Sequence, residues 1–254
     1  MAGGSEKDYK FGQKNHWRRT LWNEVLRRTG GREKSEVLIY MPGSQDLDRT
    51  VAVQKNVPSR NLIGIDRDFK NVSLIRSNGG YCIHGEVHKV LQAWPSDVRV
   101  CALMLDFNSG LVSCDWIRDL IYLLAFRRPF GTATLACNFQ RGRDQASAPF
   151  RVHADDCFAT GAPEYKKNRA AQFAYWMMML LAPVIDSDPA RAVMRMNPLI
   201  TSYKSSGVMF DSIVVSPAND YHAPLEAAML QDFPRDTNVV RKIAATLATR
   251  TRQL

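Results

Sequence analysis

The chain has 254 residues, of which 45% are apolar and 23% are charged, the composition of an ordinary globular protein rather than a disordered or fibrous one. No uninterrupted apolar run approaches the roughly 18 residues that a membrane-spanning helix needs, and the N-terminus lacks the apolar segment of a secretory signal, so a soluble, cytoplasmic protein is expected. The formal net charge is +9.

The positive charge is concentrated at the two ends of the chain. Residues 1–36 carry a net +4, residues 235–254 carry another +4, and the long stretch between them carries only +1. Basic ends around a nearly neutral body are typical of proteins that bind phosphate groups, although solubility explains them equally well. The candidate nucleic-acid contacts are four arginines near the N-terminus and two in the middle of the chain: Arg18, Arg19, Arg27, Arg28, Arg141 and Arg143.

Helical stretches alternate with short apolar runs along the first half of the chain. After a polar tail at residues 1–13, apolar spacing predicts a helix from about Asn15 to Thr29, ended by Gly30 and Gly31. Apolar runs predict strands at 37–41, 61–65, 81–83, 100–105 and 131–139, and helical stretches precede or follow them up to about 56 and at 69–77, 87–94 and 116–126. Runs that are apolar on both faces indicate buried parallel strands. The sequence therefore predicts an α/β fold with a doubly wound, mostly parallel, Rossmann-like sheet.

The last part of the chain has a different pattern. Two runs, Met194–Tyr203 and Val208–Val215, flank a Lys-Ser-Ser-Gly turn and predict an antiparallel hairpin that closes the sheet. A final helix is expected from about Asn238 to Thr249. The predicted organisation is a basic tail and helix at 1–35, one α/β domain at 36–216, and a basic C-terminal segment at 217–254 packed on the same domain.

Polar residues follow the first three predicted strands. Ligands of an open parallel sheet bind beyond the carboxyl ends of its strands, so these residues are candidate ligand contacts. Asp66 comes about 23 residues after the first loop, close to the ~20 residues expected of a nucleoside-binding half. A plain turn, a helix start or a helix cap would explain the same residues. The candidates are Met41, Pro42, Gly43 and Ser44 after the first strand, Asp66 after the second, and Gly85 and Glu86 after the third.

Several other kinds of site are disfavoured. The absence of a G-x-G-x-x-G sequence argues against a nicotinamide dinucleotide and hence against an oxidoreductase of that type. The cysteines are isolated from one another, which argues against a disulfide framework or a zinc site; they are Cys82, Cys101, Cys114, Cys137 and Cys157. His84 and His88 are spaced to share a helix face, but no third ligand lies nearby, and no metal is expected.

Four segments in order, VLIYMPGSQ, NLIGIDRD, CIHGEV and ALMLDFNSG, resemble the ordered motifs of class I S-adenosylmethionine-dependent methyltransferases. The resemblance covers roughly residues 36–216, and the predicted hairpin is similar to the family's antiparallel last strand. More narrowly, the Pro-Gly first loop, the NFQRGR segment and the C-terminal TRTR resemble methyltransferase-like proteins of phages and mobile elements. The resemblance implies that S-adenosylmethionine is the cofactor.

The resemblance also implies roles for individual residues. The loop from Met41 to Ser44 would lie against the methionine part of the cofactor, Asp66 would bind the ribose hydroxyls, and Gly85 and Glu86 would meet the adenine edge. The catalytic position would be occupied by Asp106, Phe107 and Asn108. The chain departs from the family in having only one glycine in the first loop and no Pro-Pro pair after Asp106.

Two functions are compatible with these patterns. The first is a methyltransferase acting on DNA or RNA, in which Asp106 or Asn108 accepts a proton from a target amine and Phe107 stacks on a flipped base. Methylation of carbon 5 of cytosine would need a Pro-Cys pair, which is absent. The second is a catalytically silent protein of the same fold, a nucleic-acid-binding or assembly subunit of viral or mobile-element origin in the host cytoplasm. Either could associate with a partner protein or with further copies of itself.

Overall fold

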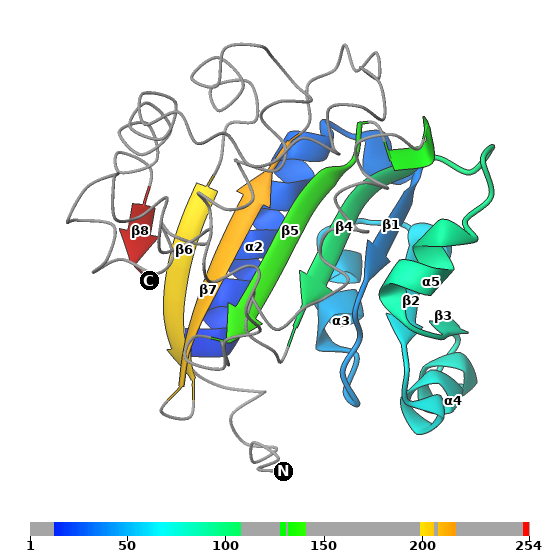
Figure 1. Ribbon diagram of the computed structural model, residues 1–254, viewed down its shortest axis with the longest axis horizontal. Helices are drawn as coiled ribbons and strands as arrows, with labels where there is room; N and C mark the ends of the chain where they lie inside the picture. Colours follow the sequence, from blue (N-terminus) through cyan, green and yellow to red (C-terminus); the bar gives the residue numbers. More distant parts are fainter. Residues whose placement is uncertain are drawn as a thin grey trace, which may run out of the picture.

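A mixed eight-stranded sheet forms the centre of the part of the chain that the computed structural model describes, which is residues 13–107, 128–130, 132–140, 199–205, 208–216 and 251–253 (Figure 1). The strand order is β3-β2-β1-β4-β5-β7-β6-β8. The strands are β1 Val37–Tyr40, β2 Leu62–Asp66, β3 Tyr81–His84, β4 Val100–Asp106, β5 Thr134–Gln140, β6 Leu199–Ser205, β7 Val208–Val215 and β8 Thr251–Gln253.

The strand directions confirm the predicted fold. Strands β1 to β5 are parallel, β7 is antiparallel to both β5 and β6, and β8 runs parallel to β6. The predicted hairpin is therefore present as β6 and β7. Strand β7 pairs with β5, and β6 pairs with β7 on its other side. Strand β8 was not expected from the sequence. The strand order reverses between β1 and β4, which is where an open sheet of this kind leaves a crevice for a ligand.

The helices lie close to where apolar spacing puts them. They are α2 Gln13–Thr29, α3 Leu47–Gln54, α4 Phe69–Ser77 and α5 Val87–Gln92, with 3-10 turns η1 Arg32–Lys34, η2 Ser59–Asn61 and η3 Arg128–Phe130. No helix in these described ranges is long and apolar enough to cross a membrane. The expected helices at 116–126 and 238–249 lie outside the described residues.

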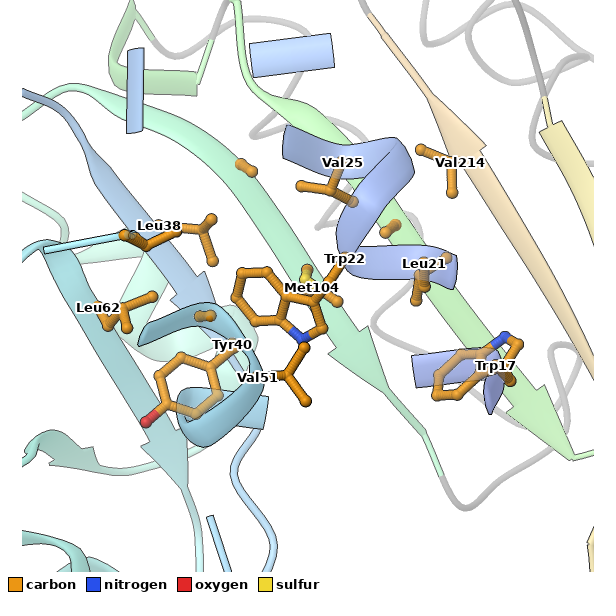
Figure 2. Close-up of a cluster of buried hydrophobic side chains, with 14 of the residues drawn as sticks. Trp17, Leu21, Trp22, Val25, Leu38, Tyr40, Val51, Leu62, Met104 and Val214 are labelled. Carbon is orange, nitrogen blue, oxygen red and sulfur yellow. The ribbon is translucent and has the colours of Figure 1, made fainter. Parts of the chain in front are cut away.

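Helix α2 packs along one face of the sheet, against β4 to β7, and it also contacts α3 (Figure 1). The apolar spacing comes from Trp17, Leu21, Trp22, Val25 and Leu26; the first four are each at most 4% exposed, and Leu26 is partly buried. Figure 2 shows the Trp22 indole among Tyr40, Val51 and Met104, in the cluster between α2, α3 and the sheet. Burial of a large aromatic side chain stabilises such packing by about 1.5–3 kcal/mol.

Glycines serve two structural purposes here. Gly30 and Gly31 have φ values of 63° and 92°, a left-handed conformation that ends α2 without steric penalty. Gly64, inside β2, allows close packing instead. A Cβ at Gly64 would lie 3.0 Å from the Pro42 ring and 3.2 Å from the Cys82 sulfur. The loop after β1 therefore rests directly on β2.

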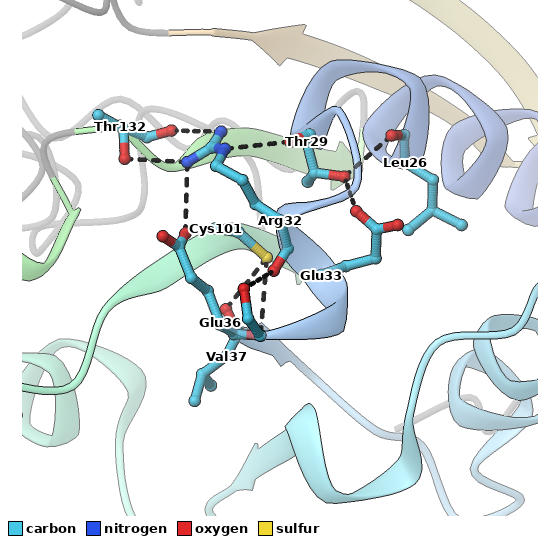
Figure 3. Close-up of polar contacts among 9 residues, drawn as sticks. Leu26, Thr29, Arg32, Glu33, Glu36, Val37, Cys101 and Thr132 are labelled. Atoms are coloured by element: carbon cyan, nitrogen blue, oxygen red, sulfur yellow. Dashed lines mark hydrogen bonds and ion pairs between the residues drawn. The ribbon is translucent and has the colours of Figure 1, made fainter.

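The amino-terminal edge of the sheet is joined to the end of α2 by Arg32 (Figure 3). Its guanidinium donates to the side-chain and backbone oxygens of Thr132, each at 2.9 Å, and to the backbone oxygen of Thr29 at 3.0 Å. Glu36 lies 3.5 Å away on the other side. Arg32, one of the basic residues of the N-terminal region, thus has a structural role at the amino-terminal edge of the sheet, away from the carboxyl ends of the strands.

Candidate functional site

Asp66 ends β2 and lies in register with His84 at the end of β3. Its Oδ1 accepts a hydrogen bond from the backbone N–H of Asp68 at 2.8 Å, and its Oδ2 accepts one from the Asn71 side chain at 3.0 Å. The N-cap of α4 is Asp68, whose side chain accepts from the N–H of Lys70. Asp66 is therefore a held, partly exposed carboxylate that is not needed as the cap, and its remaining lone pairs can accept from hydroxyl groups.

The loop Met41–Ser44 runs from β1 over the crevice. Met41 donates its N–H to the carbonyl of Met104 at 3.1 Å, so the loop starts tied to β4. Pro42 is buried, whereas Gly43 and Ser44 are exposed. A Cβ added at Gly43 would meet no atom within 4 Å. The space over this backbone is open, which allows a ligand to approach it closely.

Asp46 closes this loop, and sequence analysis did not single it out. It has a φ of 47°, an uncommon left-handed conformation for a residue other than glycine. Its Oδ1 accepts a hydrogen bond from the Tyr40 hydroxyl at 2.9 Å, and its Oδ2 lies 4.0 Å from the Arg49 guanidinium. Burial raises the pKa of Asp46, and the two neighbours offset part of that rise.

Gly85 and Glu86 follow β3. Gly85 donates its N–H to the carbonyl of Asp66 at 3.0 Å, which places the two predicted cofactor positions side by side. Glu86 stands at the N-cap of α5, but its side chain makes no capping hydrogen bond. Its carboxylate lies 2.8 Å from Lys89 and 3.6 Å from His88, and the hydrogen bond from Lys89 lowers the pKa of Glu86. The side chain is half exposed and open to solvent.

Asp106 ends β4 and is held on both sides. Its Oδ2 lies 3.2 Å from the Lys14 ammonium of α2, and its Oδ1 accepts a hydrogen bond from the Asn138 side chain of β5. Phe107 is only 4% exposed and donates its N–H to the carbonyl of Asn138 at 2.9 Å. The Phe107 ring is thus covered, and stacking on a base would require it to be uncovered. Asn108 lies outside the described residues.

Asn138 is the centre of a buried polar network that joins β4 to β7. Besides binding Asp106, its amide nitrogen donates to the Tyr203 hydroxyl of β6 at 3.1 Å. Its amide oxygen accepts from the Ser212 hydroxyl of β7 at 2.8 Å, and Ser212 in turn accepts from the Trp17 indole of α2 at 2.8 Å. The Trp17 and Tyr203 rings are stacked, with centroids 4.7 Å apart. The network fixes the orientation of Asp106 from four elements of the fold.

The charge state of Asp106 follows from these contacts. Burial alone would raise its pKa, but the Lys14 charge and the hydrogen bonds from Asn138 and Lys14 outweigh this effect, and the pKa is lowered. Burial and the neighbouring Asp106 charge raise the pKa of Tyr203, which stays a neutral phenol. Asp106 is accordingly a carboxylate at neutral pH, suited to accept hydrogen bonds and unsuited to act as an acid.

The four candidate arginines of α2 separate into two pairs. Arg18 and Arg28 have side chains only 4% exposed; Arg18 pairs with Asp48 at 3.1 Å and Arg28 with Glu24 at 2.6 Å. Arg27 is 62% exposed at its side chain, and Arg19 is also exposed. Only Arg19 and Arg27 can therefore meet a phosphate backbone without rearrangement. Arg141 and Arg143 lie outside the described residues.

No cluster of three or more potential metal ligands occurs among the described residues. His84 binds the carbonyl oxygen of Arg67 at 3.1 Å and meets the Phe69 ring edge-on at 5.6 Å. Cys82, Cys101 and Cys137 are buried thiols, and burial raises the pKa of Cys82 to about 11 and that of Cys101 to about 12. These thiols are unreactive core groups. Cys114 and Cys157 lie outside the described residues.

The residues at this edge fit S-adenosylmethionine. Asp66 offers a held carboxylate for the ribose, and Gly85 and Glu86 adjoin it. The backbone of Gly43 has open space beside it, and the carboxylate of Asp106 stands at the end of β4. The structure thus arranges the predicted cofactor contacts and the predicted catalytic carboxylate along one edge, on either side of the reversal of strand order.

The chain has a class I methyltransferase-like fold, in which a mostly parallel sheet contains one antiparallel strand. No protein-family model matches the sequence, and neither does any curated protein sequence. Solved structures do match: a proposed methylase from Haemophilus influenzae has a TM-score of 0.44 and 10% identity over 81% of this chain and 98% of its own. A proposed RNA methyltransferase from Pyrococcus horikoshii gives 0.42 and 12% over 86% and 94%.

An rRNA methylase from Streptococcus thermophilus gives a TM-score of 0.40 and 9% identity over 82% of this chain and 99% of its own. These matches are weak in both TM-score and identity, and they assign no activity to this chain. None of the three proteins is described as a protein of a phage or mobile element. They give no support to the expected resemblance to proteins of phages and mobile elements.

Sequence analysis missed Lys14, Tyr203 and Ser212 as members of the site. Nothing in their local sequence distinguishes them from solvent-facing or core residues. Asn138 carried a usable signal, because it is an amide inside the apolar run of β5, and a buried amide needs hydrogen-bond partners. The structure has Asn138 1% exposed, with its side-chain amide bonded within the protein.

Proposed function

We propose that this chain is an S-adenosylmethionine-dependent methyltransferase that acts on an amino group in a nucleic acid. The observation that carries the proposal is the ionised Asp106, held by Asn138 at the end of β4. The cofactor contacts suggested for Asp66, Gly85 and Glu86 lie on the other side of the crevice. When bound, the cofactor would supply an electrophilic methyl group.

The protein's own part in the reaction is positioning and charge. Methyl transfer is an in-line displacement that depends mainly on holding the two reacting atoms at about 3–3.5 Å. Asp106 would accept a hydrogen bond from the target amine, orient its lone pair and stabilise the positive charge that develops on it. Because Lys14 occupies Oδ2 of Asp106, the substrate amine must displace that ammonium or share the carboxylate with it.

The preference for a nucleic acid rests on charge. Arg19 and Arg27 are exposed on α2, the helix that also brings Lys14 to Asp106. Arg19 lies in the half of α2 that contains Lys14, and Arg27 lies in the last turn of the helix. A phosphate backbone bound along α2 would therefore approach the Asp106 end of the sheet at Arg19. We propose the chain's basic ends as the wider binding surface, on DNA or on RNA.

A second function is favoured by one specific contact. The Lys14–Asp106 ion pair neutralises the carboxylate from within the chain, as expected of a catalytically silent protein that retains the fold. Such a protein would bind nucleic acid, or assemble with a partner, without transferring a methyl group.

Two measurements on the same preparation distinguish these functions. Isothermal titration with S-adenosylmethionine and S-adenosylhomocysteine tests the cofactor site, and transfer of a labelled methyl group to pooled DNA and RNA tests catalysis. For the enzyme, Asp106→Asn should reduce transfer by roughly 100-fold while cofactor affinity changes little. The matched control is Asp97→Asn, which replaces an exposed carboxylate. Cofactor binding without methyl transfer supports the silent alternative, and absence of cofactor binding rules out the enzyme.

A further inference from the structure

Arg18 has an unusual hydrogen-bonding state for a buried cation. The residue is 3% exposed, and its Nε lies 3.1 Å from Oδ2 of Asp48. The other oxygen of Asp48 accepts a hydrogen bond from the Trp22 indole at 2.9 Å. The Nε and Nη1 atoms of Arg18 are both buried without a hydrogen-bond partner, although Nε takes part in the ion pair with Asp48. Native proteins leave very few buried donors unpaired, so such a donor calls for an explanation.

The position of Arg18 suggests what the missing partner is. One turn before it on α2, Lys14 reaches Asp106 at the end of β4, while Arg18 itself reaches Asp48 in the first turn of α3. Two successive turns of α2 thus reach the end of β4 and the start of α3, which follows β1, and β1 and β4 are the strands between which the order reverses and ligands of such sheets bind. The open space over Gly43 belongs to the loop that leads from β1 into α3.

The charges around Arg18 select the kind of ligand. Two cations, Lys14 and Arg18, alternate there with two carboxylates, Asp48 and Asp106. A plain anion would accept a hydrogen bond from Arg18 but would also face both carboxylates. A group that carries a carboxylate and an ammonium together can match both signs of charge.

We propose that Nη1 of Arg18 binds the α-carboxylate of the amino-acid end of the cofactor. This inference rests on the proposed function, since it takes the cofactor as given. It makes α2, which precedes the whole α/β domain in sequence, a wall of the cofactor site. The guanidinium keeps Asp48 as its structural partner and uses the unpaired nitrogen for the ligand.

The test compares two nucleosides that differ in the amino-acid end. S-adenosylhomocysteine carries it, and 5′-methylthioadenosine lacks it. By isothermal titration, the wild type should bind the first more tightly, and Arg18→Met should reduce that preference by about tenfold or more, the usual effect of losing a charge-assisted hydrogen bond. Methylthioadenosine affinity itself should change little. The matched control is Arg99→Met, which removes an exposed arginine outside α2 and should leave the preference unchanged.

The outcomes separate the inference from the function on which it rests. If the folded wild type binds neither nucleoside, the proposed function fails. If both bind and Arg18→Met keeps the wild-type preference, the role of Arg18 is overturned while the cofactor site stands. Adenosine 5′-monophosphate distinguishes the anion: an equal loss of its affinity in Arg18→Met would show a phosphate site and overturn the carboxylate assignment.

A measurement on the unmodified protein covers the case in which Arg18→Met does not fold. The guanidinium nitrogen signals of Arg18 in ¹⁵N spectra should shift on addition of S-adenosylhomocysteine and stay in place with methylthioadenosine. Equal responses to the two nucleosides would overturn the assignment.

Discussion

The two halves of the sheet present different carboxyl ends. At β1 to β3 the polar groups are exposed or partly exposed and are held by neighbours in sequence: Asp66 by residues two and five positions later, and Glu86 by Lys89. At β4 to β7, Asn138 and Ser212 are buried and the Asp106 side chain is 24% exposed, and these groups are held by residues 32 to 195 positions away, as in the Asp106–Asn138 and Trp17–Ser212 bonds. The first half is open to a ligand, and the second is covered by α2.

This difference assigns a different task to each half. An exposed carboxylate that is already oriented can exchange water for ribose hydroxyls with little rearrangement. A buried network in which the side-chain groups of Asn138 are bonded resists rearrangement and keeps Asp106 in one orientation and charge state. Binding is therefore expected to depend on the first half and catalysis on the second, with α2 linking them through Lys14 and Arg18.

The largest expected effect comes from loosening α2. Trp22 is fully buried and donates a hydrogen bond to Asp48, so Trp22→Ala should lower the free energy of unfolding by about 3–5 kcal/mol. Phe69, which is 62% exposed on α4, is the matched aromatic control, and Phe69→Ala should change stability by less than about 0.5 kcal/mol. Urea denaturation measures both. Equal effects would show that α2 is not the stabilising cover of the second half.

The next effect concerns the open half. Asp66→Ala should weaken S-adenosylhomocysteine binding by about 1.5–3 kcal/mol, because charge-assisted hydrogen bonds to the ribose are removed. Asp68→Ala, which removes the cap of α4 beside it, should lower stability by about 1 kcal/mol but leave the affinity nearly unchanged. Isothermal titration calorimetry measures the affinity of both variants for S-adenosylhomocysteine. If the two variants bind equally well, Asp66 does not contact the cofactor.

A smaller effect is expected in the pH dependence of stability. The pKa of Asp106 is lowered in the folded state, so between that value and its ordinary value of 3.8 the unfolded chain binds more protons, and stability is lost as the pH falls through this window. Asp106→Asn removes this titrating group. The slope of the unfolding free energy against pH in the acid range should therefore decrease by up to about 1.4 kcal/mol per pH unit, which corresponds to about one bound proton. The substitution should also lower stability at neutral pH, because Lys14 loses its partner.

Urea midpoints between pH 2 and pH 7 (a range of roughly five units spanning the carboxylate titration) provide the measurement for Asp106→Asn. Asp97→Asn, at an exposed position, is the control for loss of a carboxylate as such. An acid slope identical to that of the wild type would contradict the proposed ionisation of Asp106.

The smallest effect concerns the surface of α2. Replacing the exposed pair Arg19 and Arg27 by glutamine should reduce the salt dependence of duplex DNA binding by about 0.9 in the log–log slope for each phosphate that is no longer neutralised. Arg28→Gln, at a buried position paired with Glu24, should lower stability and leave the slope unchanged. Filter binding at several salt concentrations gives the slopes. An unchanged slope for the exposed pair would place the nucleic-acid surface elsewhere.

Much of the fold was predictable because its signals are local. Buried parallel strands are apolar on both faces, and the runs at 37–41, 61–65 and 100–105 each correspond to a strand. The predicted helix at 69–77 coincides with α4, whose start is fixed by the capping Asp68. The predicted antiparallel hairpin is also confirmed. The pairing of β8 with β6 could not be predicted, because a three-residue strand has too few residues to show a pattern.

For the site, the sequence by itself determined which residues stand at the ends of the first four strands, because a strand end is marked by where an apolar run stops. Asp66, Glu86 and Asp106 are at those ends as expected. Only the tertiary structure decided their surroundings: that Lys14 and Asn138 hold Asp106, that Tyr203 and Ser212 complete its network, and that Arg18 is buried beside Asp48. These contacts join residues far apart in the chain, and their formation depends on how α2 and the β6–β7 hairpin pack on the sheet, which no local pattern encodes.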